Sequence, residues 1–132
     1  MFRVLVAVSD EEEAVGKQVS FVESLPGDTD EVEVTVVHAV EGRKGSRDLQ
    51  KPDRIRSVRK AARELSEAGY TVAEEDARED PVEGIVAIAN DIDADLIVLG
   101  GRKRTPTGKA LFGSVTQSVI LNTERPVTVT GV

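Results

Sequence analysis

The segment from residue 100 to residue 116, GGRKRTPTGKALFGSVT, combines the residue types that bind anions in proteins. It holds four glycines and four basic residues, and no acidic residue occurs between positions 101 and 123 of a chain whose net charge is -7. Glycine lets the backbone approach a ligand closely, and lysine and arginine pair with phosphate oxygens. The composition therefore predicts an anion-binding loop. The alternative is a solvated loop that offsets an acidic surface.

The end of this segment, Gly113-Ser114-Val115-Thr116, is expected to open a helix. The free N–H groups and the dipole of a helix N-terminus favour an anion, and the hydroxyl groups of Ser114 and Thr116 can donate further hydrogen bonds. The alternative is that Ser114 only caps this helix. Four basic side chains that can pair with phosphate precede the helix: Arg102, Lys103, Arg104 and Lys109.

Two better-known phosphate motifs are excluded. A P-loop needs a glycine, four residues and then Gly-Lys-Ser/Thr; here Lys103 stands at the first glycine and Ala110 at the hydroxyl residue that would hold magnesium. A dinucleotide fingerprint needs Gly-x-Gly-x-x-Gly after the first strand, where this chain reads SDEEEA. The anion-binding loop therefore belongs to neither class.

Other polar clusters predict no catalytic or metal site. Asp91, Asp93 and Asp95 alternate, but an EF-hand would need glycine and glutamate where Leu96 and Arg102 stand. A turn before a strand is the better interpretation of these acids.

The histidine and cysteine content also argues against an efficient enzyme. His38 is the only histidine and the chain has no cysteine, so thiolate catalysis, disulfides and cysteine-bound metals are excluded. No nucleophile, base and acid can be assembled around His38, which we expect to be structural. A phosphoacceptor receiver site is also rejected, because Thr130 and Gly131, not a lysine, end the last expected strand.

The pattern of apolar residues predicts alternating strands and helices. Valine-rich apolar runs predict strands at residues 2–8, 31–40, 70–75, 95–100 and 126–130. Cap signals predict a first helix that Asp10 or a neighbouring residue caps and that runs to about Glu23. Helical spacing and cap signals predict further helices at residues 53–68, from residue 80 onward, and at 112–122. Gly69 falls at a helix C-cap, and Asp80-Pro81 is a strong helix start.

This alternation predicts an α/β fold with a parallel sheet. Such sheets bind ligands beyond the carboxyl ends of the strands, where the strand order reverses. The segments expected at that edge are 9–13, 41–52, 76–81 and 100–113. The anion-binding loop therefore lies where a ligand is expected.

Length and composition fit one domain, residues 1–132. No apolar run approaches the roughly 20 residues that span a bilayer, and no signal peptide is visible, so a soluble cytoplasmic protein without a membrane partner is expected. Residues 43–63 carry nine of the 17 lysines and arginines, which allows a weak polyanion patch. Nucleic acid is not an expected partner, because only 3% of the residues are aromatic.

Taken together, the motifs resemble the universal stress protein family. The resemblance covers the whole chain and rests on VLVAV, VVHAV, DPVEGIVAIANDIDADLIVLG, and GSVTQSVI running into RPVTVT. It implies a five-stranded parallel sheet of order 3-2-1-4-5 with helices on both faces, which is the Rossmann-like fold of the adenine nucleotide alpha hydrolases. It also implies a homodimer that pairs the final strands, here Val127, Thr128, Val129 and Thr130.

The resemblance also implies a nucleotide site. ATP-binding members carry Gly-x2-Gly-x9-Gly-Ser/Thr after the fourth strand, which Gly100, Gly113 and Ser114 match, while Lys103 stands at the second glycine. Ser9 stands where an aspartate usually ends the first strand. The expected contact residues are Ser9, Asp10, Ala39, Leu99, Gly100, Gly101, Arg102, Lys103, Lys109, Gly113, Ser114, Val115 and Thr116.

The resulting hypothesis is a stress-response regulatory protein that binds ATP, with Mg²⁺ if ATP is bound, or another phosphorylated small molecule. The resemblance implies slow ATP hydrolysis at most, as in some relatives, and no catalytic base is evident here. The alternative is a dimeric interaction module of the same fold that has lost nucleotide binding through Lys103 and Ser9.

Overall fold

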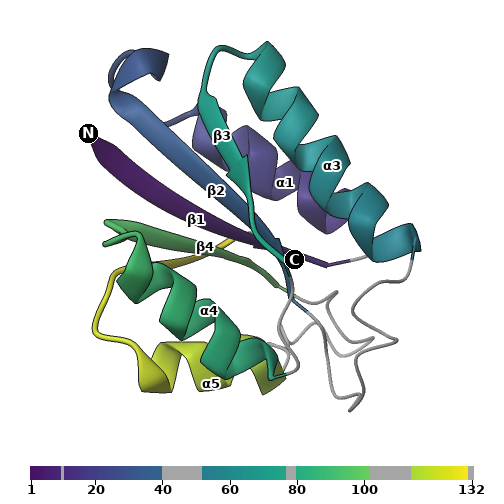
Figure 1. The fold of residues 1–132 in the computed structure, drawn as a ribbon, viewed down its shortest axis with the longest axis vertical. Helices are drawn as coiled ribbons and strands as arrows, with labels where there is room; N and C mark the ends of the chain where they lie inside the picture. The colour runs from purple at the N-terminus through teal and green to yellow at the C-terminus, as the bar shows by residue number, and fades with distance from the viewer. Residues whose placement is uncertain (10, 40–51, 77–79, 102–113, 131–132) are drawn as a thin grey trace, which may run out of the picture.

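The computed structural model describes residues 1–9, 11–39, 52–76, 80–101 and 114–130 of the chain (Figure 1). Its strands are β1 (Phe2–Val8), β2 (Val32–His38), β3 (Thr71–Glu74), β4 (Leu96–Gly100) and β5 (Val127–Thr130). Its helices are α1 (Glu12–Glu23), α3 (Pro52–Glu67), α4 (Pro81–Asp91) and α5 (Ser114–Asn122). A 3-10 turn that the sequence did not predict, η1 (Thr29–Glu31), precedes β2.

The five strands form one parallel sheet in the order β3-β2-β1-β4-β5. The central strand β1 pairs along its whole length with β2, from Phe2 opposite Val32 to Val8 opposite His38. On its other side it pairs with β4, from Val4 opposite Leu96 to Ala7 opposite Leu99. The fold class and the strand order that the sequence predicts are confirmed.

The helices cover the two faces of the sheet as separate layers (Figure 1). Val4, Val6 and Val8 of β1 point to the face covered by α1 and α3, where they join one apolar core. Leu5 and Ala7 point to the other face and pack with residues of α4 and α5. Both faces of β1 are therefore buried, which explains why its sequence is a continuous apolar run and does not alternate.

Helix α3 ends where the sequence signal places its end. Gly69 has a φ of 107°, a backbone conformation that residues other than glycine rarely adopt. The N–H of Tyr70 then donates to the carbonyl of Leu65 at 3.1 Å, which is the hydrogen bond of a Schellman C-cap. This turn directs the chain into β3.

Tyr70 connects this turn to α1. Its ring is buried, and its hydroxyl donates to the carbonyl of Val22 at 3.1 Å. Burial raises the pKa of the Tyr70 hydroxyl, and the nearby Glu23 carboxylate raises it further. The hydroxyl is therefore held protonated, as its donor role requires.

Helix α4 begins with the cap that the sequence predicts. The Asp80 carboxylate accepts a hydrogen bond from the N–H of Glu83 at 3.1 Å, and Pro81 occupies the first helical position. Both features are typical of helix starts, because they satisfy or remove N–H groups that have no partner within the helix.

Candidate functional site

The carboxyl ends of the parallel strands bring the predicted contact residues to one edge of the sheet. Ser9 and Ala39 follow β1 and β2, and the N–H of Ala39 donates to the carbonyl of Val8 at 2.7 Å. Gly101 follows β4, and its N–H donates to the carbonyl of Thr130 at 3.3 Å. Ser9, Ala39 and Gly101 thus lie along the same edge.

Ser9 serves the start of α1. Its side-chain hydroxyl oxygen accepts a hydrogen bond at 3.2 Å from the N–H of Glu11, two residues further along the chain. Ser9 is half-buried. A hydroxyl here can still donate its own hydrogen, whereas a carboxylate at this position would only accept.

The start of α5 is fastened to the end of β4. Thr116 is only 6% exposed, and its hydroxyl donates to the carbonyl of Gly100 at 3.4 Å. Val115 and Leu99 are buried in the core between α5 and the sheet. Helix α5 begins at Ser114, at the edge of the sheet formed by the carboxyl ends of the strands, and the first N–H groups of an α-helix have no partner within the helix.

Five of the predicted contact residues lie outside the described part of the chain. They are Asp10, Arg102, Lys103, Lys109 and Gly113. The role of these residues as ligand contacts stays a prediction, as does that of the other predicted contact residues.

Gln18 is a buried polar residue at this edge that the sequence-based site omits. It is 0% exposed, and its amide nitrogen donates to the carbonyl of Ala7 at 2.8 Å and to that of Val98 at 3.2 Å. The side chain thus joins α1 to both central strands. Its amide oxygen has no hydrogen-bond partner among the described residues. The signal in the sequence that could have identified Gln18 is a polar residue at a position of α1 that faces the core.

Gly100 lies against α1 beside Gln18. A Cβ atom at Gly100 would lie 3.4 Å from the amide oxygen of Gln18 and 3.5 Å from the Cβ of Ala14. These are ordinary van der Waals distances, so helix α1 packs against the end of β4 without itself requiring glycine at this position.

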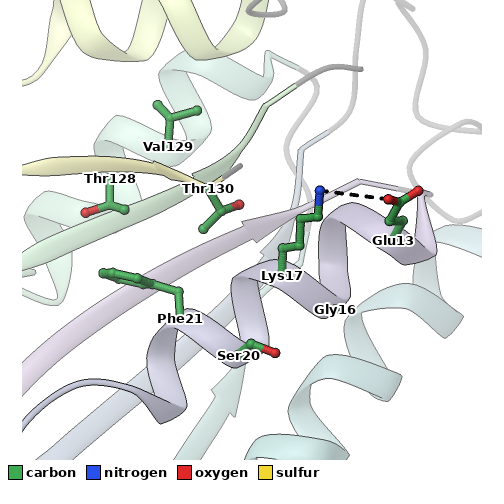
Figure 2. A pocket seen from close by; sticks show the side chains of 8 residues that line it. All are labelled: Glu13, Gly16, Lys17, Ser20, Phe21, Thr128, Val129 and Thr130. Atoms are coloured by element: carbon green, nitrogen blue, oxygen red, sulfur yellow. Dashed lines mark ion pairs between the residues drawn. The ribbon is translucent and has the colours of Figure 1, made fainter. Parts of the chain in front are cut away.

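A groove of about 680 Å³ lies between α1 and β5 (Figure 2). The α1 wall includes Lys17, whose ammonium group lies 3.8 Å from the Glu13 carboxylate, and Phe21, and the opposite wall is residues 128–130 of β5. A Cβ atom at Gly16 would meet nothing within 4 Å, so this part of the helix is open. None of the predicted nucleotide-site residues that the structure describes lines the groove.

The alternating aspartates of residues 91–95 lie near the opposite edge of the sheet, where they form structural contacts. The Asp93 carboxylate pairs with the Arg125 guanidinium at 3.1 Å. The Asp95 carboxylate accepts from the N–H of Arg3 at 2.9 Å. Among the described residues no group of acids or histidines could hold a metal ion, and no helix is long and apolar enough to cross a membrane.

Comparison with known proteins identifies relatives of this sequence. The sequence model of the Universal stress protein family matches residues 1–131. The universal stress protein MJ0577 of Methanocaldococcus jannaschii is 37% identical over 67 residues, which are 51% of this chain and 41% of that protein. The chain thus matches less than half the length of this relative.

Solved structures with the same fold cover nearly the whole chain. A universal stress protein from Archaeoglobus fulgidus is 29% identical, covers 99% of each chain and superposes with a TM-score of 0.74. A universal stress protein from the same organism in complex with dAMP is 23% identical, with a TM-score of 0.67 over 99% of this chain and 98% of that one. With the family model matched over residues 1–131, this chain belongs to the universal stress protein family.

Proposed function

We propose that this chain is a cytoplasmic stress-response protein that binds an adenine nucleotide, ATP with Mg²⁺ in the first instance, at the carboxyl edge of its sheet. The observation that carries the proposal is the fixed start of α5 at the end of β4, held by the Thr116 hydroxyl on the Gly100 carbonyl. The N–H groups at a helix N-terminus and the helix dipole attract phosphate. The dAMP complex of the family member from Archaeoglobus fulgidus supports an adenine nucleotide as the ligand.

The proposal is tested by calorimetric titration of the protein with ATP and Mg²⁺ at a stated salt concentration, because salt screens exposed phosphate contacts. The test variant is Ser114→Asp, which puts a carboxylate at the first position of α5. A carboxylate stabilises a helix at its N-terminus by about 0.3–1 kcal/mol, so lost binding would not reflect unfolding. The control is Gln117→Glu, which adds the same charge at an exposed position of the same helix.

We expect binding in about the micromolar range that weakens more than about tenfold in Ser114→Asp, whereas Gln117→Glu changes it less than about threefold, because the introduced charge is farther from the site. Absence of binding at millimolar ATP would contradict the nucleotide proposal. The interaction module that binds no nucleotide would then be the better account of the chain.

We further propose that the protein forms a homodimer through β5. β5 is the last strand of the sheet, so one of its edges has no partner strand. The carbonyl of Pro126 accepts a hydrogen bond from Ile97 of β4, and that of Thr130 accepts one from Gly101, directly after β4. Successive residues of a strand alternate in direction. Val127 and Val129 therefore direct their backbone groups to the free edge, where a second β5 can pair with them.

Proline substitutions at the two edges of the sheet test the dimer. Val129→Pro removes an N–H at the free edge of β5, and Glu74→Pro is the matched change on β3, the opposite edge strand. Light scattering after size-exclusion chromatography should give a dimer for the unchanged chain and for Glu74→Pro, but a monomer for Val129→Pro. A monomeric unchanged chain would exclude the dimer whatever the ATP titration shows.

A further inference from the structure

A second pocket, of about 410 Å³, lies at the amino edge of the sheet, opposite to the carboxyl edge. Its lining residues come from the first halves of β1 and β2 and from the end of α4: Arg3, Glu33, Thr35, Asp91, Ile92 and Asp93. Pockets that hold small molecules measure about 300–1,000 Å³. This amino-edge pocket is therefore large enough for a small ligand, and it is separate from the proposed nucleotide site.

The hydroxyl group of Thr35 is a buried polar group of the amino-edge pocket. Thr35 stands among the buried valines of β2 and is only 8% exposed. It lies opposite Leu5 of β1, so it points to the face of the sheet that α4 covers. None of the described residues forms a hydrogen bond with its hydroxyl group. Buried hydroxyl groups are as a rule hydrogen-bonded, so this one indicates a partner bound in the pocket.

The pocket also presents charges of both signs with free hydrogen-bonding positions. The Arg3 Nε lies 3.4 Å from the Glu33 carboxylate, and the two terminal nitrogens of Arg3 donate to no described residue. Two such nitrogens can bind a carboxylate through parallel hydrogen bonds. One carboxylate oxygen of Asp93 accepts from Arg125 at 3.1 Å, which leaves the other without a described donor. Asp91 has an interaction within the molecule and is not counted among the free groups.

We propose that the amino-edge pocket binds a zwitterionic amino acid. The carboxylate of the ligand pairs with the terminal nitrogens of Arg3, and its ammonium group donates to the second oxygen of Asp93. The Thr35 hydroxyl can donate to the ligand carboxylate or accept from the ammonium group. Ile92 gives the pocket an apolar contact, which favours an amino acid with an apolar side chain.

Ligands that carry only one sign of charge fit this pocket less well. A phosphate or a simple carboxylate would lie beside the carboxylates of Glu33 and Asp93, and a simple amine would lie beside Arg3. Among the described residues the acids form no group that could hold a metal ion. A zwitterion is the ligand class that places each of its charges against the opposite charge of the wall.

The test is an NMR titration of the isotope-labelled full chain with L-valine at low salt, because salt screens partly exposed charges. Two matched probes each lack one charge of valine: isobutylamine has no carboxylate, and isovalerate has no ammonium group. The site variant is Thr35→Val, which removes the hydroxyl group and keeps the size of the side chain. The control is Thr128→Val, the same change on β5 and outside the pocket.

We expect valine to shift the amide signals of Glu33, Thr35 and Ile92 with a Kd of about 1 mM, and each single-charge probe to bind at least about tenfold more weakly. Thr35→Val should weaken valine binding about tenfold, and Thr128→Val less than about twofold. Urea unfolding of Thr35→Val should match that of the unchanged chain, because the hydroxyl has no hydrogen bond to a described residue that could be lost.

Three results would overturn the proposal. The first is the absence of saturable shifts up to about 50 mM valine, and the second is equal binding of valine and a single-charge probe. The third is valine binding that Thr35→Val leaves unchanged or that shifts amides away from the amino-edge pocket.

Discussion

Gln18→Glu exchanges the amide donor of the buried Gln18 for a carboxyl oxygen. In the native chain that nitrogen lies 2.8 Å from the carbonyl oxygen of Ala7 and 3.2 Å from that of Val98. An ionised carboxyl group would face two acceptors without a hydrogen to share, at a position that is 0% exposed. A protonated carboxyl group could still donate to one of them. Folding therefore favours the protonated form and raises the pKa of the introduced group.

The size of the effect follows from this shift. Burial raises the pKa of a carboxyl group by up to 3–5 units, and each unit corresponds to about 1.4 kcal/mol. Taking about 3 units, we expect Gln18→Glu to cost about 4 kcal/mol more at pH 8 than at pH 4. Because the folded pKa is the higher one, the cost is small below the unfolded pKa of about 4.3 and grows until the pH passes the folded value.

Urea unfolding measured from pH 4 to pH 8 on the unchanged chain and on Gln18→Glu gives this difference directly. Gln18→Met is the control, because it removes both the amide donor and the amide oxygen that has no partner while keeping a similar length. Its cost should stay within about 1 kcal/mol and should not depend on pH. A pH-independent cost for Gln18→Glu would refute the argument, since it would mean that the carboxyl group reaches water.

Three further substitutions test local features of the fold. Gly69→Ala should destabilise the protein by about 2 kcal/mol in urea unfolding, because φ is 107° and a Cβ would lie 2.9 Å from the Thr29 hydroxyl oxygen; a neutral result would contradict the turn described. Gly16→Ala should stabilise α1 by about 0.5–1 kcal/mol, measured in the same way, because its Cβ enters open space. Tyr70→Phe should cost about 1 kcal/mol at pH 7 through the lost hydrogen bond to Val22. The pKa of Tyr70 is raised in the fold, so its contribution is complete below about pH 10 and is lost as the pH rises further. The difference from Tyr70→Phe should therefore shrink between pH 9 and about pH 12, and a constant difference would argue against a buried hydroxyl.

Local signals in the sequence were sufficient for the elements of the fold. The apolar run of residues 2–8 gave the bounds of β1 as the structure has them, since both faces of that strand are buried. Asp80 and Pro81 predicted the start of α4, because the cap they form there depends only on neighbouring residues. The cap of α1 was expected at Asp10 or a neighbouring residue, and the structure has Glu11 there, in the turn that Ser9 makes with Glu11.

Contacts between distant residues were not predictable in the same way. Gln18 bonds to Ala7, 11 residues away, and to Val98, 80 residues away, and no spacing rule links those positions. Likewise, the sequence suggested the Thr116 hydroxyl as a phosphate donor. The structure turns it to the Gly100 carbonyl, because the side of α5 that faces β4 depends on how the helix packs.

The helices that cover one face of the sheet come from the first half of the chain, and those that cover the other face come from the second half. This order has a consequence during protein synthesis. The first half supplies α1 and α3 for one face of the sheet, so β3-β2-β1 can assemble early on that side. Leu5, Ala7 and Val37 on the other face stay uncovered until α4, β4 and α5 leave the ribosome. At about 5–20 residues per second this interval lasts a few seconds. A nascent chain that pauses there offers an apolar sheet surface to holding chaperones, and to other nascent chains.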